Sequence, residues 1–205
     1  MALDEAVLSR APEGAAVLRF YRWAGPALTF GYSQSWAAAC VAAQSAAIPE
    51  AQTVRRSTGG GIVFHDGDIT FSLVFPWPRL SAPGEIYERI HNGTLRGLKA
   101  VGVEASLWRG RAPARQASCF SGPETSDLVD GRGRKLLGGA LRRRLGRGLY
   151  QGSLRIEPRE GLRAAVGEGL EREWGKLVFG AEEPWLRAAK TLSAKYTSDS
   201  WNRRR

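Results

Sequence analysis

Three consecutive glycines, Gly59, Gly60 and Gly61, constrain this chain more than any other feature, because they interrupt the strand-rich stretch "RRSTGGGIVFHDGDITFSLVFP". Glycine loses more backbone entropy on folding than any other residue, and a run of it weakens a sheet. Close approach of the backbone to a ligand would offset that cost. The stretch has neither the Gly-Lys-Ser/Thr of a phosphate loop nor the G-x-G-x-x-G of a dinucleotide turn. We therefore expect the glycines to line a binding site of another kind.

Charged and ionisable residues flank the glycines. Arg55 and Arg56 could hold a carboxylate or a phosphate through their planar guanidinium groups. His65 and Asp66 could polarise a bound group, although a lone histidine beside an aspartate more often fixes a turn. His91 lies in a polar helical stretch and is predicted at the surface.

The apolar spacing predicts strands in the first three quarters of the chain and helices at its end. Helices are expected at "ALDEAVL", over residues 36–48, and at "GEIYERIHNGTLRGLKAVGV", with two more after Pro158. The strands include "AAVLRFYRW", "ALTFGY", "IVFH", "ITFSLVF" and "VEASLW", and "DLVDGRGRKLLGGAL" predicts a hairpin that continues into "GLYQGSLRI". In "ITFSLVF" the alternation of apolar and polar residues predicts a half-exposed strand. Without regular βαβ alternation, these elements predict one α+β domain over residues 1–205, built on a mixed or antiparallel sheet.

The charge is strongly basic, with 30 Lys and Arg against 20 Asp and Glu. Residues 131–155 hold seven Arg and one Lys and no acidic residue. This block is either a solvated face or a surface that attracts an acidic partner. No apolar run approaches the ~20 residues of a membrane span, and the N-terminus has no basic leader segment. With two cysteines and no disulfide framework, a reduced, cytoplasmic setting is expected.

The two cysteines differ in their surroundings. Cys40 lies in an alanine-rich helix and is interpreted as core packing. Cys119 has serines and a glycine nearby and basic residues after it, which would lower its pKa and favour the thiolate. These residues alone leave open whether Cys119 packs or reacts. The scattered His and Cys residues have no metal-ligand spacing, so no metal site is predicted.

The two glycine-containing blocks together are more specific than either alone. "RRSTGGGIVFHDGDITFSLVFP" resembles the signature of the biotin/lipoate protein ligase superfamily, and "GRKLLGGALRRRLGRGLYQGSL" resembles its second block. "MALDEAVL", "LTFGYSQ" and "KYTSDSWNRRR" are also similar to that family, so the resemblance covers essentially the whole chain. It implies the α+β catalytic domain shared with class II aminoacyl-tRNA synthetases, a mixed, mostly antiparallel sheet flanked by helices. It also implies that the family's first strand would precede Met1.

The segment "SCFSGPETSDLVDGRGRKL" is similar to the cysteine segment of octanoyltransferases of the Gram-positive type. That resemblance implies an acyl-forming cysteine at Cys119, with Lys135 as its electrostatic partner and no cofactor. The implied partners are octanoyl-acyl carrier protein and the lipoyl domains of 2-oxoacid dehydrogenases or the glycine cleavage H protein, with neither nucleic acid nor membrane. Two alternatives stay open: a lipoate ligase that uses ATP and Mg, and a degenerate member that only binds.

The resemblance also implies a set of substrate-binding residues. In it, the amides of a glycine turn at Gly138 and Gly139 would stabilise an oxyanion. Gly139 and Leu141 replace a serine and a glutamine of the family pattern, and Gln151 replaces a histidine, which points to altered substrate positioning or a different acceptor. The residues expected to contact substrate are Arg55, Arg56, Thr58, Gly59, Gly60, Gly61, His65, Gly138, Gly139 and Ala140.

Overall fold

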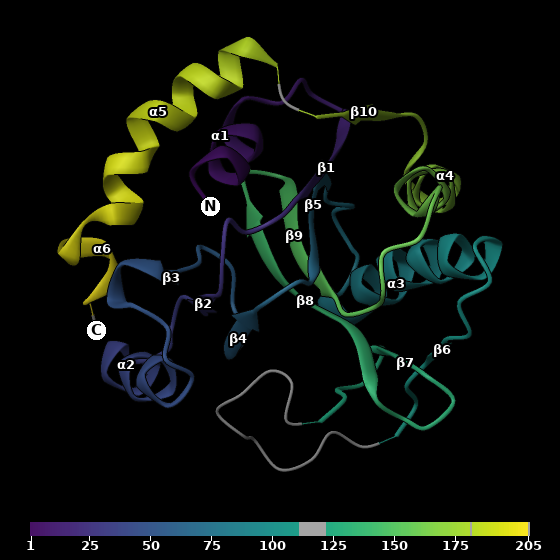
Figure 1. Cartoon of the computed structure of the whole chain (residues 1–205). Helices are drawn as coiled ribbons and strands as arrows, with labels where there is room; N and C mark the ends of the chain where they lie inside the picture. Colours follow the sequence, from purple (N-terminus) through teal and green to yellow (C-terminus); the bar gives the residue numbers. More distant parts are fainter. Residues whose placement is uncertain (111–121, 181, 205) are drawn as a thin grey trace.

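The computed structural model describes residues 1–110, 122–180 and 182–204. Cys119, the predicted nucleophile, lies outside the described residues. Two sheets and their helices form the described part (Figure 1). Within it, no helix combines the length and the apolar character that crossing a membrane requires.

A seven-stranded sheet forms the centre of the fold. Its spatial order is β10 (Leu177–Phe179), β1 (Ala16–Tyr21), β5 (Ile69–Pro76), β9 (Arg147–Leu154), β8 (Lys135–Arg144), β7 (Leu128–Val129) and β6 (Ser106–Leu107). All neighbouring pairs are antiparallel except β1 and β10, which are parallel. The α+β prediction with a mixed, mostly antiparallel sheet is therefore confirmed.

A smaller sheet lies beside the large one. It pairs β2 (Ala27–Phe30) with β3 (Thr53–Arg55) in parallel and with β4 (Ile62–His65) antiparallel. The short 3-10 helix Glu50–Gln52 leads into β3, and α2 (Trp36–Ser45) packs on this sheet through a small apolar core around Leu28 and Phe30. Helix α2 ends before the predicted residue 48, because Ala47 adopts a left-handed conformation with φ 52°.

Helices cover both faces of the large sheet (Figure 1). On one face, α3 (Pro83–Ala100) and α4 (Leu162–Trp174) bury the main core, which includes Phe71, Leu73 and Tyr150. On the other face, α1 (Ala2–Arg10) and α5 (Glu183–Thr197) enclose a second apolar cluster. The short helix α6 (Asp199–Asn202) follows α5. The α3–α4 crossing is tight: a Cβ on Gly97 would lie 2.5 Å from the Cα of Val166.

The prediction that strand "ITFSLVF" is half-exposed is wrong. Both its apolar face and its polar face are buried, because β5 is a central strand with a neighbour on each side and helices above and below. Thr70 and Ser72 thus face the protein interior rather than solvent, exposed by only 3% and 2%. This buried polar face becomes part of the candidate site.

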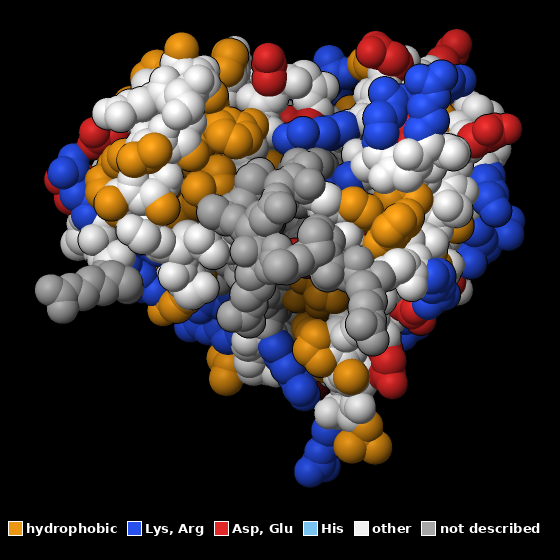
Figure 2. Space-filling model, turned by 90° about the horizontal axis from the view of Figure 1, so that it is seen from below, with side chains coloured by type: hydrophobic (Ala, Val, Ile, Leu, Met, Phe, Trp, Pro, Cys, Tyr) orange, Lys and Arg blue, Asp and Glu red, His pale blue; other side chains and the backbone are white. Residues whose placement is uncertain are grey.

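The space-filling view shows an uneven distribution of side chains. Hydrophobic side chains gather on the side where α2 lies, and Lys and Arg side chains cluster toward the opposite edge (Figure 2). Helix α2 buries only Ala39 and Ala43 fully, while Val41 is 64% exposed. Cys40, interpreted as core packing, is half-buried.

Candidate active site

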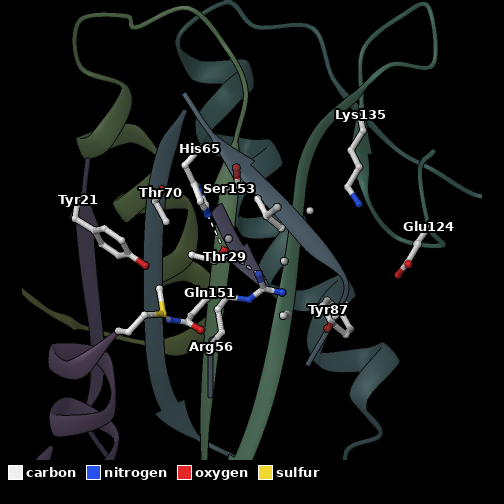
Figure 3. Close-up of a pocket in the computed structure, with 17 residues that line it drawn as sticks. Tyr21, Thr29, Arg56, His65, Thr70, Tyr87, Glu124, Lys135, Gln151 and Ser153 are labelled. Carbon is white, nitrogen blue, oxygen red and sulfur yellow. Dashed lines mark hydrogen bonds between the residues drawn. The ribbon is translucent and has the colours of Figure 1, made fainter. Parts of the chain in front are cut away.

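A cavity of about 180 Å³ lies between the two sheets. Strands β5, β8 and β9 supply its floor through the polar face described above. The small sheet and the glycine loop supply the opposite wall, and Lys135 and Glu124 lie across the cavity from His65 (Figure 3). Its lining includes Tyr21, Thr29, Arg56, Gly60, Val63, His65, Thr70, Tyr87, Lys135, Ala140, Gln151 and Ser153.

The glycine run lies very close to the backbone at Gly31, whereas its sequence predicts an approach to a ligand. A Cβ on Gly31, at the end of β2, would lie 1.8 Å from the carbonyl oxygen of Gly60. Gly60 has φ 83° and lines the cavity, and Gly59 donates its N–H to the carbonyl of Leu141 at 3.4 Å. Among the described residues, Gly60 is the member of the run that borders the cavity. The backbone that approaches most closely is that of Gly31, the residue after β2.

Arg56 forms part of the cavity wall, as predicted. Its guanidinium donates to Thr29 Oγ1 at 2.8 Å and to the carbonyls of Gly59 and Gly61 at 3.0 and 2.9 Å. These bonds tie the glycine loop to β2. Arg56 therefore shapes the wall and brings a positive charge to it.

The prediction that Arg55 binds a substrate carboxylate or phosphate is wrong. The Arg55 side chain points to the side of the strand opposite to that of Arg56. It is fully buried and stacks over the ring of Phe30. Its guanidinium donates, at 2.7–3.2 Å, to the backbone carbonyls of Tyr32, Gln34, Trp201, Asn202 and Arg204. Because neutral carbonyls occupy the guanidinium, Arg55 fastens the C-terminal segment to β3.

His65 is held by two hydrogen bonds inside the wall. Nε2 lies 2.8 Å from Thr29 Oγ1, and Nδ1 lies 2.8 Å from Asp68 Oδ2. The partner is therefore Asp68 and not the exposed Asp66 of the sequence interpretation. Trp23 stacks on the imidazole with ring centres 4.4 Å apart. Burial lowers the pKa of His65 despite the opposing effect of Asp68, so the ring is neutral at neutral pH.

Asp68 collects several donors on one carboxylate oxygen. Besides His65, Ser153 Oγ and Thr70 Oγ1 donate to Oδ2 at 2.5 and 3.2 Å. Burial raises the pKa of Asp68, but these donors together outweigh it, and the pKa is lowered. Asp68 is therefore ionised at neutral pH.

Lys135, predicted as the electrostatic partner of the nucleophile, lines the cavity and is 7% exposed. Its Nζ lies 2.7 Å from Asp127 Oδ2. Burial raises the pKa of Asp127, and Lys135 partly offsets that effect. A Cβ on Gly138 would lie 2.5 Å from Nζ, so the glycine leaves room for the ammonium.

The glycine turn expected at Gly138 and Gly139 is wrong, because both residues and Ala140 lie inside strand β8. Arg155 donates its N–H to the carbonyl of Leu136, which fixes the alternation of the β8–β9 pair. By that alternation the N–H of Gly138 and Ala140 point at β9, whereas the N–H of Gly139 points away from it. Of the two predicted oxyanion amides, Gly139 is the one directed away from β9, on the side of β8 that pairs with β7 nearer its start.

A buried pair supports the floor from the core side. Tyr150 occupies the space where Cβ atoms on Gly139 and Gly152 would lie, at 2.2 and 2.6 Å. His91 Nε2 lies 2.7 Å from Tyr150 Oη, and Nδ1 lies 2.5 Å from the carbonyl of Ser126. The prediction that His91 is a surface residue is wrong, since it is fully buried and burial lowers its pKa to about 4. His91 is buried because α3 packs against the sheet, where both ring nitrogens find partners.

Thr58 is buried but does not line the cavity. It donates to Gln151 Oε1 at 2.7 Å, and Gln151 Nε2 donates to Asp4 Oδ2 at 2.7 Å. Gln151, at the position of the family histidine, is thus held in one orientation by a loop and by α1. Thr58 acts on the site through Gln151.

Several cavity residues went unrecognised in the sequence, among them Thr29, Thr70 and Ser153. The alternation of polar residues in "ITFSLVF" and "YQGSL" was the available signal. Thr70 pairs with Ser153 across β5 and β9, so two alternating strands place their polar faces together. Assigning that face to solvent concealed the signal.

The mixed, mostly antiparallel sheet flanked by helices is the fold that the resemblance noted in the sequence implies. The chain belongs to the family of the lipoyl protein ligase A/B catalytic domain, whose model matches residues 1–168. Among its curated relatives is octanoyltransferase LipM of Carboxydothermus hydrogenoformans, 38% identical over 70% of this chain and 55% of the relative. LipM of Geobacillus kaustophilus is 31% identical over 95% of this chain and 77% of the relative. For four of the curated octanoyltransferases LipM, including the first one named here, the chain spans only 55% to 61% of the relative's own length.

Solved structures share the fold. One is a lipoate-protein ligase A bound with ATP, which matches with a TM-score of 0.77 at 21% identity over 98% of this chain and 92% of the other. Another is a bi-partite lipoate protein ligase from Thermoplasma acidophilum, with a TM-score of 0.71 at 21% identity over 98% of this chain and 89% of the other. At this identity they establish the fold alone.

Proposed function

We propose that this protein is an octanoyl-[acyl carrier protein]:protein N-octanoyltransferase that acts through a thioester at Cys119. The single observation that carries the proposal is the cavity between the sheets, with the Lys135 ammonium held beside it by Asp127. The names of the LipM relatives support the same reaction.

In the first step, the thiolate of Cys119 attacks the carbonyl carbon of the donor thioester. A new thioester forms as the donor thiolate leaves, and because one thioester replaces another, the step needs no ATP. Lys135 would stabilise both the thiolate and the developing oxyanion, and the Gly139 amide is a further donor. Here Asp127 acts as a positioning residue, because it holds the Lys135 side chain against Gly138 of strand β8.

In the second step, a lysine amine of a lipoyl domain attacks the acyl-enzyme. A C–N bond forms and the C–S bond breaks, which releases an amide and makes the step downhill. The cavity would hold the octanoyl chain against Val63, Ala140 and Tyr87, whose aliphatic and ring surfaces border it. Neither step of this proposed reaction uses ATP or another cofactor.

The basic surface supports an acidic protein as donor or acceptor. Residues 131–155 hold seven Arg and one Lys. Some of these side chains bind within the protein: Arg142 donates to the carbonyl of Ser57 and Arg155 to that of Phe64. Arg132 and Arg143 remain largely exposed and add to a positive field that would steer acyl carriers and lipoyl domains.

The transfer assay tests this function. The protein is incubated with octanoyl-acyl carrier protein and a lipoyl domain without ATP, and the mass of the lipoyl domain is followed. We expect a gain of one octanoyl group, abolished by Lys135→Met. Octanoylation or lipoylation that requires free acid and ATP would instead identify a ligase, and no modification under either condition would identify a binding protein.

A further inference from the structure

A chain of hydrogen bonds runs through the cavity wall from Arg56 to Asp68. Arg56 donates to Thr29 Oγ1 at 2.8 Å, Thr29 Oγ1 lies 2.8 Å from His65 Nε2, and His65 Nδ1 lies 2.8 Å from Asp68 Oδ2. Thr29, Arg56 and His65 all border the cavity. The wall opposite Lys135 therefore contains a continuous polar path (Figure 3).

The partners fix the direction of each hydrogen bond. An ionised Asp68 can only accept, so Nδ1 of His65 carries the proton and donates it. In the neutral ring Nε2 is then an acceptor, and the Thr29 hydroxyl donates to it. Arg56 occupies one lone pair of Thr29 Oγ1, which leaves the other for a donor inside the cavity. Each hydrogen bond in the chain therefore has its donor on the Arg56 side and its acceptor on the Asp68 side.

The charged groups around His65 act on its protonation in opposite directions. Asp68 stabilises an imidazolium, whereas Arg56 and Arg155 oppose it. Trp23 covers one face of the ring, and Thr29 Oγ1 lies 2.8 Å from Nε2. His65 is thus a neutral base at neutral pH with a carboxylate ready to balance a transferred proton.

We propose that Thr29, His65 and Asp68 form a relay that accepts the proton of the incoming lysine ammonium as it attacks the acyl-enzyme; this rests on the proposed function. The ammonium gives a proton to Thr29 Oγ1 while the hydroxyl proton moves to His65 Nε2. The freed nitrogen lone pair forms the C–N bond, and the sulfur leaves with a second nitrogen proton. The products are the amide, the Cys119 thiol, and one proton on His65 that is later released to water.

Three variants separate the relay from the rest of the site. Thr29→Val removes the hydroxyl at nearly constant volume, Thr29→Ser restores it, and His65→Gln removes the base. Asp66→Asn is the matched control, because Asp66 is exposed beside His65 and outside the hydrogen-bonded chain. Each protein is first loaded from octanoyl-acyl carrier protein, and transfer to the lipoyl-domain lysine is then timed across a pH series.

We expect Thr29→Val and His65→Gln to load normally and to transfer about a hundredfold more slowly at neutral pH. Wild type, Thr29→Ser and Asp66→Asn should transfer at a rate nearly independent of pH between the pKa values of His65 and lysine. His65→Gln should instead speed up about tenfold per pH unit, because free amine then has to form in solution. With hydroxylamine, which is uncharged at neutral pH, all variants should deacylate alike.

Two outcomes would overturn the relay while leaving the proposed function intact. One is a pH-independent transfer rate in His65→Gln, and the other is an equal slowing of the lysine and hydroxylamine reactions. Failure of wild-type protein to form an acyl-enzyme at all would overturn the proposed function instead.

Discussion

The adjacent residues Arg55 and Arg56 are both buried, yet they organise two regions of opposite character. Arg55 binds only backbone carbonyls and forms what we call the C-terminal anchor, which joins β3 to Tyr32, Gln34 and residues 201–204. Arg56 lies in the wall of the cavity beside Thr29 and His65. Since successive residues of an extended strand point to opposite sides, one sequence pair serves both stability and the site.

The two regions also differ in what they can titrate. The guanidinium and the carbonyls of the anchor keep their charge states over any ordinary pH. The cavity and its support contain His65, His91 and Asp127, each with a pKa shifted mainly by burial. Loss of the anchor should therefore cost stability at every pH, whereas the cavity region should respond to pH.

The largest effect is expected from Arg55→Met. Methionine fills similar space but leaves five carbonyls without their donor, of which those of Trp201 and Asn202 are in buried hydrogen bonds. We expect the free energy of unfolding to fall by about 4 kcal/mol or more. Urea denaturation followed by circular dichroism measures it, and Arg55→Lys, with a smaller donor set, should recover part of the loss. A cost below about 1 kcal/mol would mean that the anchor is not structural.

The pH dependence of stability tests the cavity region. His91 titrates at 6.5 in the unfolded chain and at about 4 in the fold, because burial disfavours its charged form. The unfolded state therefore takes up the proton first as pH falls. The contribution is complete above pH 6.5 and is lost toward pH 4, roughly 3 kcal/mol in all. His65, with its pKa also lowered, adds to the same trend.

His91→Gln serves as the control for that prediction. Glutamine can still accept from the Tyr150 hydroxyl but does not titrate. Its unfolding free energy should change less between neutral pH and pH 4 than that of the wild type, measured by urea denaturation at each pH. Identical pH dependence in both proteins would assign the titration to other groups.

Arg56→Lys should affect activity more than stability. A lysine keeps the charge but cannot reach Thr29, Gly59 and Gly61 with a planar fork. We expect octanoyl transfer to fall about tenfold, with a smaller loss of unfolding free energy than in Arg55→Met. A variant as unstable as Arg55→Met with unchanged activity would erase the distinction between the two regions.

The smallest effect is expected at the rim of the anchor. The Arg204 guanidinium lies 3.8 Å from the ring centre of Tyr32 and 4.3 Å from that of Trp201. Arg204→Ala removes these contacts but keeps the backbone carbonyl that Arg55 binds. A loss of about 1 kcal/mol is expected in thermal or urea unfolding. A loss as large as that of Arg55→Met would place the anchor's stability in its aromatic rim.

Much of the fold followed from the sequence, because apolar periodicity and turn residues act locally. The hairpin of β7 and β8, helix α3 and the strands β4 and β5, which lie in different sheets, were predicted from such patterns. Strand β10 was not, since three residues carry too little periodicity and β10 pairs with a strand far away in the sequence. The burial of both faces of β5 likewise depends on its neighbours and not on its own residues.

The candidate site was predicted less evenly. The glycine run, Arg56 and His65 stood out as unusual residues in a strand-rich stretch, whereas Lys135 came from the family resemblance. Gly60, Arg56, His65 and Lys135 line the cavity. Arg55 was misassigned, since nothing local shows that five carbonyls from distant segments converge on it. Thr29 was missed for the same reason, because it lies 36 residues from its partner His65. Asp68 is only three residues from His65, and it was missed because the adjacent Asp66 was taken as the partner.

The central claim is that an acyl group is carried by Cys119 and not by the other cysteine. The most direct measurement is the intact mass of wild type, Cys119→Ala and Cys40→Ala after incubation with octanoyl-acyl carrier protein alone. Cys40 provides a matched control because it is half-buried in α2, outside the cavity lining. We predict one octanoyl adduct on wild type and Cys40→Ala and none on Cys119→Ala. An adduct that persists in Cys119→Ala, or its absence from all three proteins, would contradict the account.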